Sequence, residues 1–342
     1  MNIIFRVDSS TKMGIGHLMR CLTLADEFKK QNHNIAFICR ELLGNLIDLV
    51  KQKNHEVIAL PVDKAFQSDN IYLDWLGAEQ EEDAAQVIDK IPKNVNLLIV
   101  DSYALDEKWH KKLRSHAKKI MVIDDLADRN FDCDILLNQN LGSKKENYKN
   151  KVPKDCQLLL GCDYALLRPE FAESRKEVLT KRKQTKSIKN ILISMGGSDT
   201  NNLTYDVLQG INDDFNVIVV LGASSPHNDT IRNYAKNKNI KVVINARNMA
   251  ELMLETDLAI GAGGSTSWER CCLGLPTLSY VTEDNQRTIA ENLERIGAVK
   301  IVKNFTQDFQ ELSNNFSAWK KMSNHAQNIC DGLGAKRVVE LC

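Results

Sequence analysis

Residues 14–20 read GIGHLMR, and they follow the apolar run IIFRV of residues 3–7. Apolar side chains then recur at helical spacing, which predicts an amphipathic helix over residues 17–30. A strand, a glycine turn and a helix in this order are typical of a parallel α/β sheet. His17 lies in the first helical turn, where backbone N–H groups and the helix dipole favour a neutral imidazole. His17 is therefore a candidate general base.

Two other interpretations of this turn are open. Gly14 and Gly16 occupy the first two positions of a dinucleotide-binding GxGxxG fingerprint, but Met19 replaces the third glycine. The next predicted strand, residues 35–39, is not followed by a clear ribose-binding acid, so a nicotinamide or flavin is disfavoured and we expect no cofactor. In the structural interpretation, the loop has no chemical role and His17 caps the helix.

Length and charge narrow the functional classes. The chain has 342 residues, which suggests two domains of ~100 to 200 residues each. Its 45 basic and 45 acidic side chains give no global attraction to nucleic acid or an anionic membrane. We find neither a signal peptide nor ~18 consecutive apolar residues, and the nine cysteines include no CxxC pair. We therefore expect a cytoplasmic protein without a membrane span, disulfide framework or metal site, and we take a monomer as the working expectation.

Short β-branched runs alternate with helical patterns along the whole chain, which predicts α/β architecture with two Rossmann-like lobes. Strands are predicted near residues 2–7, 35–39, 56–60, 96–100, 119–123, 134–137, 157–160, 190–194, 216–221, 240–244, 257–260, 277–281 and 299–302. The predicted domains are 1–170, with the candidate base, a charged linker over 171–189, and 190–320 as the second lobe. The helix over 321–342 is expected to pack back on the first lobe.

Two glycine-rich loops follow strands of the second lobe. One reads MGGSDTNN over residues 195–202, and the other reads GAGGST over residues 261–266. Glycine lets the backbone approach a ligand closely, and loop N–H groups bind phosphate oxygens. The predicted anion-binding residues are Gly196, Gly197, Ser198, Gly263, Gly264, Ser265 and Thr266. Neither loop continues into the GK[ST] of a Walker motif, which argues against an ordinary ATPase or kinase.

Polar side chains near these loops complete a candidate nucleotide site. Glu269 lies about one turn into the second helix, where a carboxylate can accept both hydroxyls of a ribose. Asn285 and Gln286 begin a later helix and can bind sugar hydroxyls. The structural alternatives are that Glu269 is a solvated helix residue and that Asn285 and Gln286 cap their helix.

Several motifs in a fixed order resemble one known family. They are GxGHxxR at 14–20, DSY at 101–103, DD at 124–125, CDILLN at 133–138, YALLR at 164–168, MGGSD at 195–199 and NQ at 285–286. Together they resemble the UDP-2,4-diacetamido-2,4,6-trideoxy-β-L-altropyranose hydrolases of pseudaminic acid biosynthesis. The second lobe also resembles the nucleotide lobe of the peptidoglycan N-acetylglucosaminyltransferase, through GGS at 263–265, Glu269 and Gln286.

The resemblance implies a GT-B-like fold, with parallel sheets facing a cleft that holds a UDP-sugar. It implies metal-independent hydrolysis that releases UDP with inversion at the anomeric carbon. In that scheme His17 is the base, and Tyr103 and Asn285 line the sugar site as catalytic residues. The remaining residues are assigned to substrate binding: Gly14, Gly16, Arg20, Arg168, Glu269 and Gln286, together with the glycine-loop residues.

Other functions stay open at this stage. A glycosyltransferase of the same architecture transfers the sugar to an acceptor instead of water. A hydrolysing UDP-sugar 2-epimerase breaks the C2–H bond, and a binding module holds UDP without turnover. A tyrosine such as Tyr103 at the end of a strand can also be a residue at the edge of the core.

Overall fold

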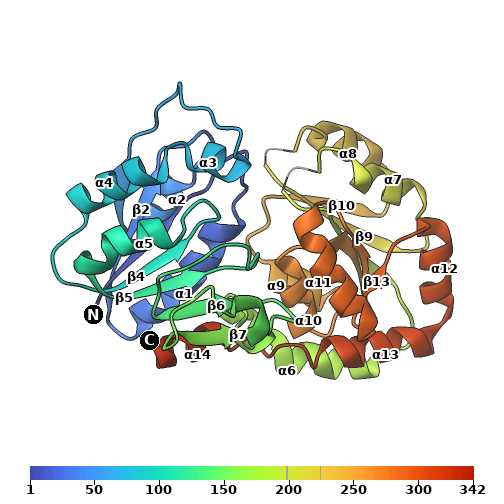
Figure 1. Ribbon diagram of the computed structural model, residues 1–342. Coiled ribbons are helices and arrows are strands. Elements are labelled where there is room, and N and C mark those ends of the chain that lie inside the picture. Colours follow the sequence, from blue (N-terminus) through green and yellow to red (C-terminus); the bar gives the residue numbers. More distant parts are fainter. Residues whose placement is uncertain (198, 224) are drawn as a thin grey trace. The chain divides into compact units, whose positions relative to one another are not determined.

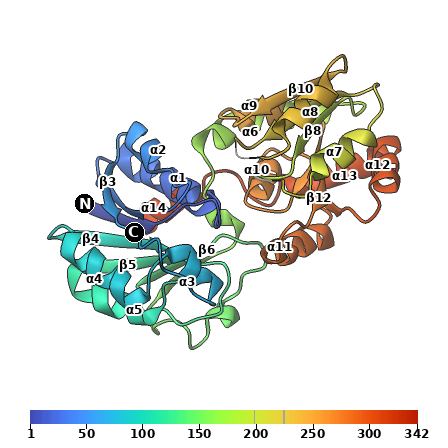
Figure 2. The same cartoon turned by 90° about the horizontal axis from the view of Figure 1, so that it is seen from above.

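The structure, a computed structural model, describes residues 1–197, 199–223 and 225–342, with the side chain of Asn285 excepted. The chain forms two compact units (Figures 1 and 2). Unit 1 comprises Met1–Leu166 and Gly334–Cys342, and unit 2 comprises Leu167–Leu333. Each unit is built on its own parallel sheet, with helices on both faces.

Unit 1 contains a seven-stranded sheet in the order β3-β2-β1-β4-β5-β6-β7, with every pair parallel. Its strands are β1 (Asn2–Val7), β2 (Asn34–Arg40), β3 (Glu56–Leu60), β4 (Val95–Asp101), β5 (Ala117–Ile123), β6 (Ile135–Asn138) and β7 (Gln157–Leu160). Its helices are α1 (Gly16–Lys30), α2 (Ile47–Gln52), α3 (Ile71–Leu76), α4 (Gln80–Lys90), α5 (Glu107–Leu113) and α14 (Gly334–Leu341). Short 3₁₀ turns are η1 (Arg114–His116), η2 (Lys145–Tyr148) and η3 (Cys162–Tyr164).

Unit 2 contains a six-stranded parallel sheet in the order β10-β9-β8-β11-β12-β13. Its strands are β8 (Asn190–Ser194), β9 (Asn216–Leu221), β10 (Ile240–Ile244), β11 (Leu258–Ala262), β12 (Thr277–Tyr280) and β13 (Lys300–Ile301). Its helices are α6 (Pro169–Gln184), α7 (Leu203–Gln209), α8 (Asn228–Ala235), α9 (Met249–Leu254), α10 (Thr266–Cys272), α11 (Asp284–Arg295), α12 (Phe305–Asn314) and α13 (Phe316–Ala326).

The predicted fold class of two parallel-sheet α/β units is confirmed, and each predicted strand overlaps an observed one. The alternation of side chains along the buried strands explains why. In β1, Ile3, Phe5 and Val7 pack against α1, α2 and α14, whereas Ile4 packs on the opposite face with α4 and α5. Arg6 shares the face of Ile4 and is fully buried in ion pairs with Asp8 and Asp83. A strand that is buried on both faces in this way fits only between two layers of helices.

The charged segment expected as a linker over 171–189 instead forms most of α6 in unit 2. Its composition suggested a solvated connection, but Phe171, Val178 and Arg182 lie on a buried face of the helix. The Arg182 guanidinium donates hydrogen bonds to the carbonyls of Leu273 (2.5 Å), Thr256 (2.8 Å) and Met253 (3.1 Å). These carbonyls lie at or near the C-terminal ends of α9 and α10, where backbone carbonyls have few donors within the helix. Arg182 therefore stabilises unit 2.

The end of the chain is divided between the units. Within the segment 321–342, α13 and the residues up to Leu333 belong to unit 2, whereas α14 packs against α1 in unit 1 (Figure 1). Val338 and Val339 of α14 join the same buried cluster as Leu18 and Cys21 of α1. The return to unit 1 therefore supplies apolar surface that covers the helix carrying His17.

Among the described residues, no helix combines the length and the apolar character that crossing a bilayer requires.

His110 is an unusual member of the unit 1 core. It is fully buried between Trp109 and Phe131, and neither ring nitrogen has a hydrogen-bond partner in the described part of the chain. Burial, reinforced by the positive charges of Arg129 and Arg114, lowers the pKa of His110 to about 3. The native state therefore holds a neutral imidazole throughout the weakly acidic range.

The lowered pKa of the buried His110 predicts that the free energy of unfolding depends on pH. Below the ordinary pKa of 6.5 the unfolded chain binds a proton at His110, whereas the folded chain binds it only near pH 3. The free energy of unfolding therefore falls as the pH falls through this window, by up to about 1.4 kcal/mol per pH unit. In His110→Phe this contribution disappears, and urea titrations at pH 7 and pH 4.5 measure a smaller difference than in the wild type. The control His116→Phe keeps the wild-type difference, and an equal difference in His110→Phe would contradict the assignment.

Candidate functional site

The candidate site of unit 1 lies where the strand order of its sheet reverses. β1 leads into α1 on one side, and β4 pairs with β1 on the other, with Val7 opposite Asp101. Ligand sites of open parallel sheets form at such switch points, outside the carboxyl ends of the strands. The register carries Asp101, the last residue of β4, to the beginning of the helix that bears His17.

Five side chains form one connected polar network at this point. His17 Nδ1 lies 2.6 Å from Asp101 Oδ1, and Arg20 binds both oxygens of Asp101 with Nε and Nη2 at 2.6 Å each. The third guanidinium nitrogen of Arg20 reaches Asp125 Oδ2 at 3.0 Å, and the Tyr103 hydroxyl donates to Asp125 Oδ1 at 2.6 Å. The rings of His17 and Tyr103 meet edge to face at 4.6 Å. This network fixes the orientation of the His17 imidazole.

The charges of the network determine which nitrogen of His17 carries a proton. Burial alone would raise the pKa of Asp101, but Arg20 and His17 outweigh it and hold that pKa well below its usual value. Asp101 is therefore an acceptor at both oxygens, and the Nδ1–H tautomer of His17 follows from this partner. Nε2 then carries the free lone pair, as a general base requires.

Tyr103 is held as a neutral phenol. Its burial, followed by the negative charge of Asp125, raises its pKa far above the ordinary value. The hydroxyl donates a hydrogen bond to Asp125 and keeps its proton, so its oxygen retains lone pairs that can accept a hydrogen bond. Tyr103 is thus more than a residue at the edge of the core.

Sequence reasoning gave no role to Asp101 or Asp125, although both stood in quoted motifs. The signal was their position at the ends of β4 and β5, where parallel strands expose polar side chains at one edge. The sequence did not reveal the strand order. In the structure β4 pairs with β1 on the side opposite β2, which brings Asp101 next to the end of β1.

Arg20 was expected to contact substrate, and in the structure its guanidinium binds two carboxylates. Gly14 and Gly16 line the loop before α1, where Gly14 adopts φ +78°. A Cβ atom on either glycine would meet no atom within 4 Å, so the surface of this loop is open beside His17. The positive φ at Gly14 requires glycine, because an L side chain there is strained.

A second buried cluster supports the loop that carries Asp125. Asp124 accepts a hydrogen bond from the Tyr148 hydroxyl at 2.8 Å and pairs with Arg129 at 3.1 Å. Asn138 donates to the same tyrosine oxygen at 2.9 Å. Because each polar group in the cluster is held by another, the backbone around Asp125 has little freedom to move.

The candidate site of unit 2 also lies where the strand order of its sheet reverses, but it is built from glycine loops. Its strand order reverses between β8 and β11, and the two glycine loops follow these strands. Gly196, at φ +93°, and Gly197 are exposed, and a Cβ on either would meet nothing within 4 Å. A Cβ on Gly261 would instead clash with the carbonyl oxygen of Ser194, so close strand packing requires this glycine. The loops therefore lie side by side at one edge of the sheet, with open backbone at Gly196 and Gly197.

The loop after β12 reaches the second glycine loop. A Cβ on Gly264 would lie 3.7 Å from Gln286 Nε2, and Gln286 Oε1 accepts a hydrogen bond from Thr282 at 3.0 Å. Gly263 packs near Ser279. Ser265 is the N-cap of α10, and Thr266 is its first residue.

Ser198 lies outside the described residues. The backbone of Asn285 is in the first turn of α11, and its side chain is outside the described part.

Glu269 is not a solvated helix residue. Its side chain is 16% exposed, and Oε2 has no hydrogen-bond partner among the described residues. Burial raises the pKa of Glu269, opposed by the positive charges of Arg168 and Arg270. Arg168 Nη2 lies 3.5 Å from Glu269 Oε1, and its Nη1 donates to the Arg247 carbonyl at 3.1 Å. One carboxylate oxygen is thus held by Arg168, and the other is a buried acceptor without a partner among the described residues, which is an arrangement that calls for an explanation.

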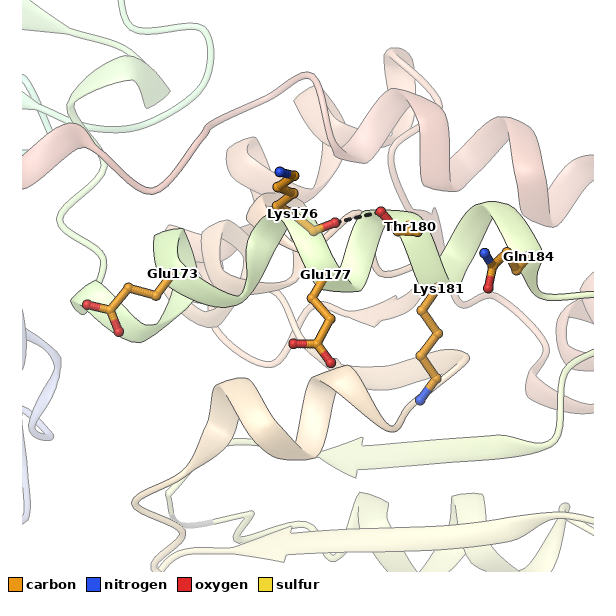
Figure 3. Close-up of a pocket in the computed structure, with 6 residues that line it drawn as sticks. All are labelled: Glu173, Lys176, Glu177, Thr180, Lys181 and Gln184. Atoms are coloured by element: carbon orange, nitrogen blue, oxygen red, sulfur yellow. Dashed lines mark hydrogen bonds between the residues drawn. The ribbon is translucent and has the colours of Figure 1, made fainter.

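A surface hollow of about 540 Å³ lies along α6, away from these groups (Figure 3). Its lining residues are Glu173, Lys176, Glu177, Thr180, Lys181 and Gln184. Acidic and basic side chains balance there, and none of the predicted site residues contributes to it. Within the ranges that the structure describes, no three His, Cys, Asp or Glu side chains are grouped so that they could hold a metal ion.

The chain is similar to several known proteins. Residues 171–339 match the family model described as the glycosyltransferase family 28 C-terminal domain. The chain is 33% identical over 296 residues to an uncharacterized protein of Methanocaldococcus jannaschii, covering 84% of this chain and 57% of that relative. It is 29% identical over 300 residues to the UDP-2,4-diacetamido-2,4,6-trideoxy-beta-L-altropyranose hydrolase of Campylobacter jejuni, covering 87% of this chain and 97% of that protein. The resemblance to this hydrolase family is confirmed.

The fold has solved counterparts as well. The crystal structure of Acinetobacter baumannii MurG superimposes with a TM-score of 0.68 at 15% identity, covering 99% of this chain and 98% of that chain. At this identity the likeness concerns the fold, and it confirms the GT-B fold class.

The polar network predicts the tautomer of His17. In Asp101→Ala the acceptor opposite His17 Nδ1 is lost, and Arg20 Nη2, which lies 3.2 Å from Nδ1, can only donate to it. An accepting Nδ1 favours the Nε2–H tautomer. Long-range ¹H–¹⁵N spectra of protein labelled at histidine should show Nδ1–H for His17 in the wild type and Nε2–H in the variant. Asp128→Ala is the control and keeps the wild-type spectrum. An unchanged tautomer in Asp101→Ala would refute the proposed orientation.

Proposed function

We propose that this protein is a UDP-sugar hydrolase that releases UDP from UDP-2,4-diacetamido-2,4,6-trideoxy-β-L-altropyranose, with inversion at the anomeric carbon. The relatives and the fold indicate an enzyme that processes sugar nucleotides. The observation that carries the more specific proposal is the imidazole of His17, whose Nδ1 lies 2.6 Å from Asp101 and whose Nε2 has no hydrogen-bond partner among the described residues. Such a pair activates a water molecule, and hydrolysis requires an activated water.

In the proposed reaction, His17 Nε2 accepts a proton from water as the water oxygen forms a bond to the anomeric carbon. The bond between that carbon and the UDP oxygen breaks, and its electron pair leaves with the diphosphate. Asp101 stabilises the imidazolium that forms, because it is an ionised acceptor on the opposite nitrogen. A single displacement from the face opposite UDP inverts the centre, without a covalent intermediate.

Unit 2 supplies the groups for the leaving nucleotide. The exposed loop at Gly196 and Gly197 and the loop from Gly264 to Thr266 offer backbone N–H groups to the diphosphate, whereas the Gly263 N–H already donates to the Tyr280 carbonyl. Glu269 Oε2, which has no partner among the described residues, accepts a hydrogen bond from a ribose hydroxyl. Because a diphosphate is already a stable leaving group, the reaction as proposed draws on no metal ion and no second carboxylic acid.

A glycosyltransferase is the second candidate, favoured by the family 28 match over residues 171–339. In a transferase the same base would deprotonate an acceptor hydroxyl instead of water. Incubation of enzyme and UDP-sugar without acceptor separates the two. Rapid stoichiometric release of UDP supports the hydrolase, and slow leakage supports the transferase.

His17→Ala is expected to lower the rate of UDP release by about 10²- to 10⁴-fold, since it removes the general base. The affinity for UDP should stay within about twofold, because the proposed UDP groups lie on other elements. A coupled assay for UDP and titration calorimetry measure the two quantities. His116→Ala serves as the control, and EDTA should leave the wild-type rate unchanged. Turnover close to wild type in His17→Ala would remove His17 from the role of base.

Glu269→Ala is expected to weaken UDP binding by about ten- to a hundredfold, the cost of a hydrogen bond to a charged group. Calorimetric titration with UDP measures the effect, and a thermal melt verifies that unit 2 stays folded. Glu291→Ala, which changes an exposed glutamate on α11, is the matched control. Unchanged affinity in Glu269→Ala would mean that the free carboxylate oxygen does not bind the nucleotide.

A further inference from the structure

The helix α3 places two aromatic side chains beside the polar network of unit 1. The Tyr72 ring lies 5.3 Å from that of Tyr103, and the Trp75 ring lies 5.5 Å from Tyr72 and 6.4 Å from Tyr103. Tyr103 in turn contacts His17. The aromatic residues Tyr72, Trp75 and Tyr103, here called the aromatic wall, are therefore continuous with the proposed base.

The aromatic wall is only half-buried, which is unusual for tryptophan in this chain. Trp109, Trp268 and Trp319 are each at most 1% exposed, whereas Trp75 remains accessible. Aromatic side chains release the largest free energy when apolar surface covers them, so rings left open beside a candidate base offer a binding surface.

The backbone of α3 holds these rings in place. The Asn70 side chain accepts hydrogen bonds from Tyr72 N (2.9 Å) and Leu73 N (3.4 Å), which caps the beginning of the helix. Gly77, at φ +72°, ends it by donating to the Leu73 carbonyl at 2.9 Å. Asp74 pairs with Lys12 at 2.5 Å, which links α3 to the loop before α1. The wall is thus preorganised and does not depend on a ligand to form.

We propose that Tyr72 and Trp75 bind the apolar face of the sugar and make the enzyme selective for a 6-deoxy sugar over its 6-hydroxy counterpart. This inference rests on the proposed function, because it concerns the sugar that His17 would process. The negative π-face of an aromatic ring attracts the C–H groups of a pyranose and of a methyl substituent. A hydroxyl placed over the ring faces gives up hydrogen bonds to water for contact with carbon, whereas a methyl group in the same position has no such bonds to lose.

Steady-state kinetics with two substrates test this selectivity. In Trp75→Ala, KM for the UDP-linked 6-deoxy sugar should rise about tenfold, with kcat within about twofold. The preference over the 6-hydroxy analogue, as a ratio of kcat/KM, should fall by a similar factor. Trp75→Phe should restore most of both. Ile71→Ala is the matched control, because Ile71 lies on the same helix and is 56% exposed. A wild-type preference in Trp75→Ala would overturn the proposal.

Tryptophan fluorescence separates this inference from the proposed function. Because the other three tryptophans are buried, quenching by acrylamide mainly reports Trp75. In the His17→Ala variant the intact UDP-sugar should protect Trp75 from quenching, whereas UDP alone should not. If the wild type hydrolyses the substrate and Trp75 stays equally accessible with bound UDP-sugar, the wall is not the sugar surface. Failure of the wild type to hydrolyse any UDP-sugar, with Trp75 still protected, would instead overturn the proposed function alone.

Discussion

The site of unit 1 depends on one buried carboxylate, Asp101. It is fully enclosed, and it remains ionised because Arg20 binds both of its oxygens. A carboxylate in this position can only accept, so it sets the tautomer of His17 and keeps Arg20 pointed at Asp125. Without this charge, Arg20 would be a buried cation with one partner fewer, and the imidazole would be free to rotate.

Both units use the same topological position for different chemistry. In unit 1 the reversal of strand order lies between β1 and β4, where a titratable pair is assembled. In unit 2 it lies between β8 and β11, where exposed glycines and a carboxylate with a free oxygen are assembled. At such a reversal the helices after the two central strands leave on opposite faces, so the loops diverge and a ligand can enter. The same topological position thus carries the candidate base in unit 1 and the candidate anion-binding loops in unit 2.

Much of the fold could be predicted because buried parallel strands have a strong local signature. Runs such as residues 3–7 and 191–193 are buried on both faces, and only a strand between two helical layers accommodates them. The charged stretch 171–189 was misread for the opposite reason. Its hydrophobic signal is weak, since one of the buried positions of α6 is Arg182, whose guanidinium is satisfied by carbonyls from distant helices. Local composition contains no information about those carbonyls.

The sequence by itself determined the strands, the helix that begins beside His17 and the glycine loops, because these depend on neighbours within a few residues. Only the tertiary structure decided that Asp101, 84 positions after His17, is its partner. It also decided that Arg20 binds two carboxylates and that Glu269 Oε2 is buried without a hydrogen-bond partner in the described part of the chain. The physical reason is that strand order and register are set by packing over the whole unit, whereas helix and turn preferences are set locally. The candidate site therefore depends on contacts between residues that are far apart in the sequence.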